Sequence, residues 1–297
     1  MAAEPPRTSM TDAGRETARR AGPVEPVMVT VLEAGCRIER PDRVVGEEPL
    51  EIRLQGPMSG PEPVAVTMRT PGHDFELAVG FLLAEGLLAD QDEVRAVKYC
   101  DLPEGDAQQF NVVTVTSGRP VDVAARRRTM TVSASCGICG TATLEQLQGR
   151  CPALPRGERI GASLLTSLPG RLREQQRLFE ETGGLHAAGL YDLVGRALAV
   201  REDVGRHNAV DKLVGWAALQ RLLPLAGAVL VVSGRVSFEI VQKAAVAGIP
   251  TVVAVSAASS LAVATARTLG MTLAGFVRDG RATVYSAPWR VEGGAPQ

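Results

Sequence analysis

Short apolar runs separated by Gly, Pro and Asp mark the first part of the chain. These runs combine β-branched and aliphatic side chains, which is typical of strands in a small sheet. They lie at residues 27–31, 50–54, 64–68, 94–99 and 110–116. The interval between the third and fourth runs differs, because Leu77, Ala78, Phe81 and Leu82 recur there at helical spacing. This pattern predicts a helix, with Asp74 as its N-cap.

The pattern changes after about residue 130, where longer helical stretches alternate with apolar strand-like runs. Helical stretches are predicted at 172–181, 208–223, 238–247 and 261–269, and strands at 198–201, 228–232 and 251–255. Such alternation is typical of a layered α/β domain. The sequence therefore predicts an α/β (α+β) protein with a small mixed N-terminal domain at 27–130 and a layered domain at 131–290. Residues 1–26 are predicted to be a disordered leader and 291–297 a tail.

The amino-acid composition indicates a globular protein and argues against nucleic acid or membranes as general partners. The 297 residues include 45% hydrophobic side chains, enough for a large core, and 32 Lys and Arg almost balance 33 Asp and Glu. This balance gives no electrostatic case for nucleic acid or membrane surfaces as partners. Residues 244–266 carry no charge, but Gly248 and Pro250 interrupt them, so we interpret them as a helix end, a strand and a helix.

The cysteines indicate a reducing compartment. There are five, an odd number, and the chain starts without the apolar stretch of a signal peptide, so we predict a cytoplasmic protein without a disulfide framework. Cys136 and Cys139 form a C-x-x-C pair with a glycine after each. A thiolate attacks or ligates, and this arrangement lowers a thiol pKa from about 8.5 to about 7 or below.

Two interpretations of the cysteine pair stay open at this point. A structural zinc site needs two further ligands, and only three histidines and three scattered cysteines are available. A reactive thiolate needs none, so ligand counting favours chemistry over metal, and we predict no metal ligands. A thioredoxin-like role lacks its strand-to-helix context.

Three polar, glycine-bearing stretches lie at the ends of predicted elements, where α/β domains place ligand contacts. In 182–186 a glycine suits a helix C-cap, but this leaves His186 unexplained. In 202–208 the polar groups, including Arg206 and His207, exceed what capping by Asn208 and Asp211 requires. In 233–237 a turn with Arg235 precedes a helix start, which suits a phosphate or pyrophosphate.

Together these motifs resemble the formate dehydrogenase accessory sulfurtransferase (FdhD-type) family. The residues that carry the resemblance are Arg69-Thr70-Pro71-Gly72, Cys136-Gly137-Ile138-Cys139-Gly140, Thr182-Gly183-Gly184-Leu185-His186-Ala187-Ala188, Glu202 through Lys212, Ser233-Gly234-Arg235 and Gly275-Phe276-Val277-Arg278. The resemblance implies a homodimeric sulfurtransferase that carries persulfide sulfur from a cysteine desulfurase to the molybdenum cofactor in its bis-guanine-dinucleotide form. That cofactor is then inserted into apo formate dehydrogenase. The family resemblance also implies a second domain with the cytidine deaminase fold, although the zinc signature of the deaminases is absent here.

Carried over to this sequence, Cys136 holds the persulfide and Cys139 assists. The predicted cofactor-binding residues are Phe276, Val277, Arg278, Asp279, Gly280, Arg281, Ser233, Gly234, Arg235, His186, Arg206 and His207. Arg278 and Arg281 are the expected pyrophosphate partners, and GDP is expected to mimic part of the cofactor. The alternative is a non-enzymatic, cofactor-binding chaperone of formate dehydrogenase whose cysteine pair is structural or regulatory.

Overall fold

The structure is a computed structural model that describes residues 21–100, 109–121, 147, 149–152, 154 and 158–293. Cys136, Cys139 and the predicted domain boundary near residue 130 lie outside the described residues. So do residues 1–20 of the predicted leader and residues 294–297 of the predicted tail.

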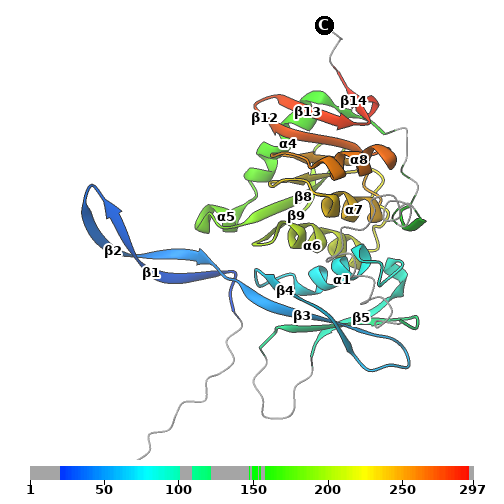
Figure 1. The fold of residues 1–297 in the computed structure, drawn as a ribbon, viewed down its shortest axis with the longest axis horizontal. Coiled ribbons are helices and arrows are strands. Elements are labelled where there is room, and N and C mark those ends of the chain that lie inside the picture. Colours follow the sequence, from blue (N-terminus) through cyan, green and yellow to red (C-terminus); the bar gives the residue numbers. More distant parts are fainter. Residues whose placement is uncertain are drawn as a thin grey trace, which may run out of the picture.

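A long hairpin opens the described chain and projects from the rest of the molecule (Figure 1). It consists of β1 (Val24–Glu33) and β2 (Cys36–Val45), paired antiparallel along their whole length. Ala34 and Gly35 form its turn with positive φ angles of 50° and 83°, the conformation that suits a two-residue hairpin. The expectation that 27–31 belongs to the small sheet is wrong, because β1 and β2 form a separate sheet. β1 also begins at Val24, inside the range predicted as leader.

The small sheet has four strands in the order β4-β3-β6-β5. These strands are β3 (Glu48–Gln55), β4 (Glu62–Arg69), β5 (Val94–Tyr99) and β6 (Val112–Ser117), close to the predicted positions. Helix α1 (Asp74–Ala84) packs on it, and a short 3₁₀ turn, η1 (Gln91–Glu93), leads into β5.

Asp74 is not the N-cap of α1, as the sequence predicted. His73 occupies that position and makes no side-chain cap. The Asp74 carboxylate is buried and accepts bonds from the Arg69 guanidinium at 3.0 and 3.2 Å and from the Tyr99 hydroxyl at 2.9 Å. A buried carboxylate needs a charged partner more than a helix needs a cap, which explains the difference.

The larger sheet has six strands in the order β13-β12-β11-β10-β8-β9. Its strands are β8 (His186–Asp192), β9 (Ala197–Asp203), β10 (Ala228–Val232), β11 (Thr251–Ala254), β12 (Thr272–Arg278) and β13 (Arg281–Ser286). β10, β11 and β12 are parallel, whereas β8, β9 and β13 continue the sheet antiparallel. A β7 (Ile160–Gly161) and β14 (Val291–Glu292) pair lies apart, with β14 inside the predicted tail, and η2 (Pro288–Arg290) precedes β14.

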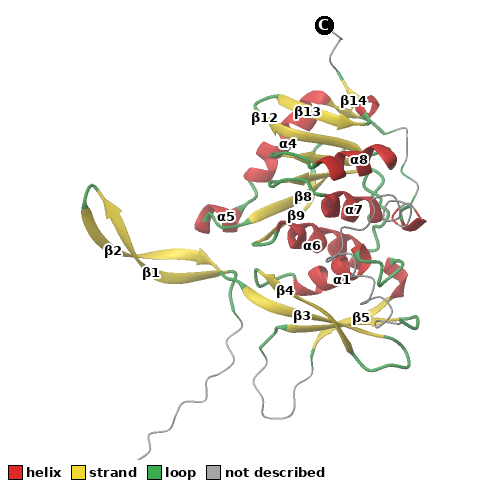
Figure 2. Cartoon of the chain, viewed as in Figure 1, coloured by secondary structure: helices red, strands yellow, loops and turns green. Residues whose placement is uncertain are grey.

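Helices cover both faces of the six-stranded sheet (Figure 2). The helices α6 (Arg206–Leu219), α7 (Phe238–Val246) and α8 (Ser260–Thr268) pack on the face that carries Leu230 and Val252. Helix α4 (Ala162–Arg173) packs on the opposite face, over Val231 and Val253. The layered α/β prediction is therefore confirmed. The cytidine deaminase likeness stays a prediction.

Two predicted details are wrong in this half. The single helix expected at 172–181 is two, because α4 ends at Arg173 and α5 (Arg177–Thr182) begins after a break. Asn208 and Asp211 do not cap α6, which begins at Arg206 after Gly205. Gly183 does end α5 in the left-handed conformation with φ 67°, as expected for a C-cap.

Residues 244–266 contain the end of α7, strand β11 and most of α8, as predicted. Among the described residues, no helix combines the length and apolar character needed to span a bilayer.

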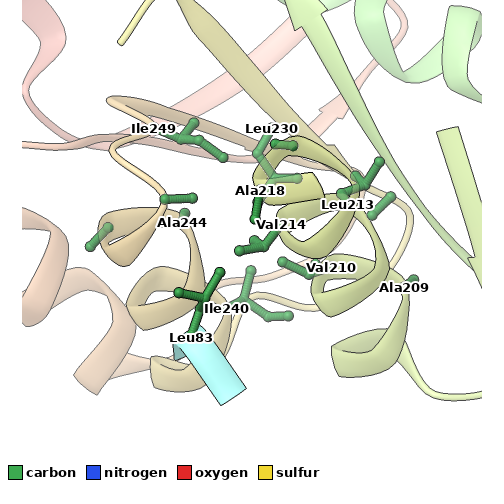
Figure 3. Packing of buried hydrophobic residues seen from close by; sticks show 14 of the residues in the cluster. Leu83, Ala209, Val210, Leu213, Val214, Ala218, Leu230, Ile240, Ala244 and Ile249 are labelled. Atoms are coloured by element: carbon green, nitrogen blue, oxygen red, sulfur yellow. The ribbon is translucent and has the colours of Figure 1, made fainter. Parts of the chain in front are cut away.

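The two sheets share one buried apolar core, which continues from the small sheet through α1 and α6 to α7. Figure 3 shows part of this core, from Leu83 of α1 through α6 and α7 to Leu230 of β10. Gly80 of α1 and Gly215 of α6 lie at the crossing of these helices. A Cβ atom on Gly80 would overlap the carbonyl of Asp211, and one on Gly215 would overlap the carbonyl of Glu76. The crossing therefore requires glycine on both helices, since backbone atoms are in direct contact there.

Candidate functional site

The predicted ligand residues lie at one edge of the six-stranded sheet, where β10 and β11 end. The loop after β10 and the loop after β11 are joined side by side: the Val236 amide donates to the Ala257 carbonyl, and the Ser259 amide donates to the Val236 carbonyl, both at 2.9 Å. The Phe276 amide extends the row by donating to the Ser256 carbonyl at 3.1 Å. The carboxyl ends of parallel strands form the usual ligand site of such sheets.

Ser233 fixes the first loop to the neighbouring strand. Its hydroxyl accepts from the Ala187 amide at 2.9 Å, and its amide donates to the Ala187 carbonyl at 3.0 Å. The Ser233 side chain thus holds the loop against β8.

Gly234 allows two basic side chains to approach the loop. A Cβ atom at this position would lie 3.3 Å from His186 Nδ1 and 3.7 Å from Arg206 Cδ. Desolvation, together with the nearby Arg206 charge, lowers the pKa of His186 against the opposing effect of Asp203. With its pKa lowered in this way, His186 is uncharged at neutral pH.

Arg206 carries a donor without an acceptor. Its Nε is buried and has no hydrogen-bond partner among the described residues. A buried guanidinium N–H that lacks a partner is costly. An anionic oxygen beside Gly234 would satisfy it.

His207 joins the start of α6 to the start of α7. Its Nε2 lies 3.1 Å from the Ser237 hydroxyl, and its Nδ1 lies 3.1 Å from Oε2 of Glu239. Desolvation lowers the pKa of His207, with further lowering by Arg206, Lys243 and His186, against the opposing Glu239 carboxylate.

Asp203 is fully buried and forms the hydrogen bonds that hold the polar stretch 202–208 in place. It pairs with Lys212 Nζ at 2.7 Å and accepts from the amides of Thr70 and Gly205 and from the Asn208 side chain. The neighbouring Glu202 accepts from the first amides of α5, at 3.0 Å from Leu178 and 2.8 Å from Phe179. Glu202 and Asp203, which belong to the predicted ligand stretch 202–208, therefore have a structural role. The sequence signal for this was an Asp and a Lys nine residues apart, which does not identify them as partners.

The segment 276–281 forms the tip of the β12–β13 hairpin. Phe276 is 46% exposed and has a positive φ of 52°, and the turn residues Asp279 and Gly280 have φ angles of 51° and 74°. A surface hollow of about 520 Å³ lies here, lined by Phe276, Arg278, Asp279, Arg281, Ala282 and Thr283. Val277 points the other way, into the core beneath α4. The hollow offers two arginines and one aromatic face to a ligand.

Within the described part of the chain, the predicted ligand groups thus lie in one row along the sheet edge, from β8 to β12. None of the described residues forms a cluster of three or more His, Cys, Asp or Glu side chains able to hold a metal. Among the described cysteines, Cys36 is exposed at the tip of the β1–β2 hairpin, and burial raises the pKa of the Cys151 thiol to about 11.

Comparison with known proteins supplies the assignment. A family model described as the FdhD/NarQ family matches residues 45–292. This chain belongs to that family. A relative from Mycolicibacterium paratuberculosis, named "Sulfur carrier protein FdhD", is 48% identical over 271 residues, covering 89% of this chain and 97% of the relative. One of the same name from Streptomyces coelicolor is 48% identical over 285 residues, covering 94% and 96%.

A solved structure agrees with the family. A protein from Desulfotalea psychrophila, named as a formate dehydrogenase accessory protein, superimposes with a TM-score of 0.69 at 25% identity. The match covers 91% of this chain and 99% of the other. The family resemblance inferred from the motifs is therefore confirmed.

Proposed function

We propose that this protein is a cytoplasmic sulfur carrier that serves formate dehydrogenase by passing persulfide sulfur to its molybdenum cofactor. The observation that carries the proposal is the near-complete match to relatives named as sulfur carriers, in a chain that has the Cys136–Cys139 pair. A cysteine desulfurase is the sulfur donor, apo formate dehydrogenase is the recipient of the finished cofactor, and the working unit is a homodimer.

The proposed chemistry is thiol exchange. The Cys136 thiolate attacks the outer sulfur of the donor persulfide, which leaves Cys136 with a persulfide and the donor with a thiolate. Cys139 then attacks the inner sulfur, forming a Cys136–Cys139 disulfide and releasing hydrosulfide. Hydrosulfide and one proton replace an oxygen ligand of the molybdenum substrate, and water leaves. A cellular dithiol reduces the disulfide and returns the carrier to its starting state.

The sheet edge supports the cofactor half of the proposal. The bis-guanine-dinucleotide form of the cofactor carries pyrophosphate groups and purine rings. Arginine forks suit pyrophosphate oxygens, and the unpartnered Nε of Arg206 and the exposed Arg278 and Arg281 are of this kind. The exposed ring of Phe276 is available for stacking.

A persulfide-loading experiment distinguishes the sulfur-carrier function from the alternative function, a chaperone whose cysteines hold zinc. After incubation of the reduced protein with a cysteine desulfurase and cysteine, intact-mass spectrometry should show one added sulfur, mapped to the peptide that contains Cys136. Cys36→Ser removes an exposed cysteine and should not change the result. One tightly bound zinc per chain, with no added sulfur, would instead establish the chaperone.

GDP binding tests the cofactor site. Calorimetry with the native protein should show saturable binding. Loss of one charge-assisted contact in Arg278→Ala or Arg235→Ala should weaken binding about tenfold each, equivalent to about 1.4 kcal/mol. Arg37→Ala changes an exposed arginine of the β1–β2 hairpin and serves as the control. Absence of GDP binding, or equal affinities for all four proteins, would exclude this edge as the nucleotide site.

A further inference from the structure

Two neighbouring helices of the sheet edge begin in the same way. The loop after β10 ends in Ser237, the N-cap of α7, and the loop after β11 ends in Ser259, the N-cap of α8. The residues before them, Val236 and Ala258, pair with each other in a parallel bridge. Both serines have extended backbones, with φ and ψ of −94° and 174° for Ser237 and −80° and 158° for Ser259. The two positions are therefore matched in residue type and backbone.

The two hydroxyl groups are used differently. Ser259 caps its helix in the ordinary way, since its Oγ accepts from the Ala262 amide at 3.2 Å. Ser237 makes no side-chain cap, and its Oγ lies 3.1 Å from His207 Nε2. An N-cap bond stabilises a helix by about 1 kcal/mol. The Ser237 hydroxyl gives up that bond in favour of an imidazole.

A carboxylate on the far side of the ring sets the role of this imidazole. Glu239 Oε2 lies 3.1 Å from His207 Nδ1, and a carboxylate can only accept, so Nδ1 carries the proton. Nε2 is then an acceptor for the Ser237 hydroxyl proton. The charged and titratable groups around the ring are Glu239 and Lys243 on α7, Arg206 on α6 and His186 on β8, and with burial they leave the pKa of His207 lowered. The ring is therefore neutral and able to act as a base at pH 7.

Ser237, His207 and Glu239 are accessible to small molecules from solvent. The His207 side chain is 29% exposed and that of Glu239 is 57% exposed. The Ser237 side chain does not cap the first amides of α7, and amides at a helix start can stabilise a developing oxyanion.

We propose that Ser237, His207 and Glu239 form a catalytic triad in which Ser237 is a nucleophile for acyl transfer, an activity separate from the cysteine chemistry. Small activated esters of anionic acids are the substrate class, because the Nε of Arg206 lacks an acceptor beside this loop. Ser237 Oγ bonds to the acyl carbon while its proton moves to His207 Nε2. The alcohol departs with that proton. Water, deprotonated by the same nitrogen, then bonds to the acyl carbon; the bond to Ser237 Oγ breaks, Oγ takes the proton back from His207 Nε2, and the acid is released. Glu239 is a positioning residue that holds the ring.

A fluorophosphonate probe tests the proposal on the full chain, since it phosphonylates activated serines. Peptide mapping should find the label on Ser237, and Ser237→Ala should abolish it. His207→Gln should slow labelling about a hundredfold or more, the usual contribution of a general base, and Glu239→Gln should slow it less. Ser259→Ala, the matched serine of α8, should label at the native rate.

The pH profile adds a readout that a structural contact would not give. Because the pKa of His207 is lowered, labelling should stay constant down to about pH 7 and decline only below the ordinary imidazole pKa of about 6.5. Circular dichroism confirms that each variant is folded. The proposal is overturned if Ser237 is unlabelled, if Ser237 and Ser259 label equally, if the label is found only on cysteine, or if folded His207→Gln labels at the native rate.

Discussion

Replacing Cys136 by alanine is expected to abolish formate dehydrogenase activity in a host whose only FdhD-family protein is this variant. The proposed carrier holds sulfur as a persulfide on this side chain, and neither a methyl group nor the remaining thiol at Cys139 can accept it from the donor and release it by internal exchange. Activity of the client enzyme in cell extracts measures the effect. The amount of folded carrier, determined by blotting and thermal unfolding of the purified variant, should be unchanged.

Two other cysteines provide the controls. Cys36 lies exposed at the hairpin tip, and the thiol of Cys151, with its pKa raised to about 11 by burial, stays protonated at neutral pH and is a poor nucleophile. Cys36→Ser and the small, conservative Cys151→Ser should both support formate dehydrogenase activity. Full client activity with Cys136→Ala would contradict the sulfur-carrier assignment, and loss with all three variants would indicate a general structural defect.

Replacing Lys212 by methionine is expected to destabilise the protein by about 4 kcal/mol, the cost of removing one partner of a buried ion pair. Lys212 is 1% exposed and lies 2.7 Å from Asp203, which is 0% exposed. Its Nζ also donates to the carbonyls of Thr70 and Glu202 at 3.0 and 3.3 Å. Methionine fills the space but leaves the Asp203 carboxylate without its charged partner and removes a donor from two carbonyls.

Urea unfolding followed by tryptophan fluorescence and circular dichroism measures this effect. The control is Arg43→Ala, which removes an exposed ion pair to Glu181 with side chains 61% and 40% exposed. Exposed pairs contribute less than about 1 kcal/mol. If both substitutions shift the free energy of unfolding equally, the Asp203–Lys212 pair is not the buried support of the sheet edge.

The contacts of Lys212 are an example of packing that the sequence does not predict. The polar groups of residues 202–208 exceed what helix capping requires, and from the sequence this excess predicts ligand binding. The structure divides the stretch 202–212: Asp203, Asn208 and Lys212 face inward and tie down residues 68–70, whereas Arg206 and His207 face the loop after β10. A charged side chain has the same appearance in a sequence whether it meets solvent or a buried partner more than a hundred residues away.

The types of the secondary-structure elements and the family can be predicted from the amino-acid sequence. Apolar runs such as 228–232 and 251–255 can bury both faces only inside a layered sheet, so their position and type follow from local composition. The ordered motifs, including the cysteine pair, indicated the family that the comparisons confirm.

Which of these elements pack against one another follows from the three-dimensional fold and not from local sequence. Periodicity reports that a face is buried but does not identify the partner, so neither the contact of Gly80 with Gly215 across α1 and α6 nor the separate β1–β2 hairpin could be predicted. The same holds for Ser237 and Ser259, which look alike in the sequence as helix N-caps. They differ because α6 places His207 beside one of them and not the other. Local sequence determines secondary structure, whereas long-range packing determines which side chains come within reach to react.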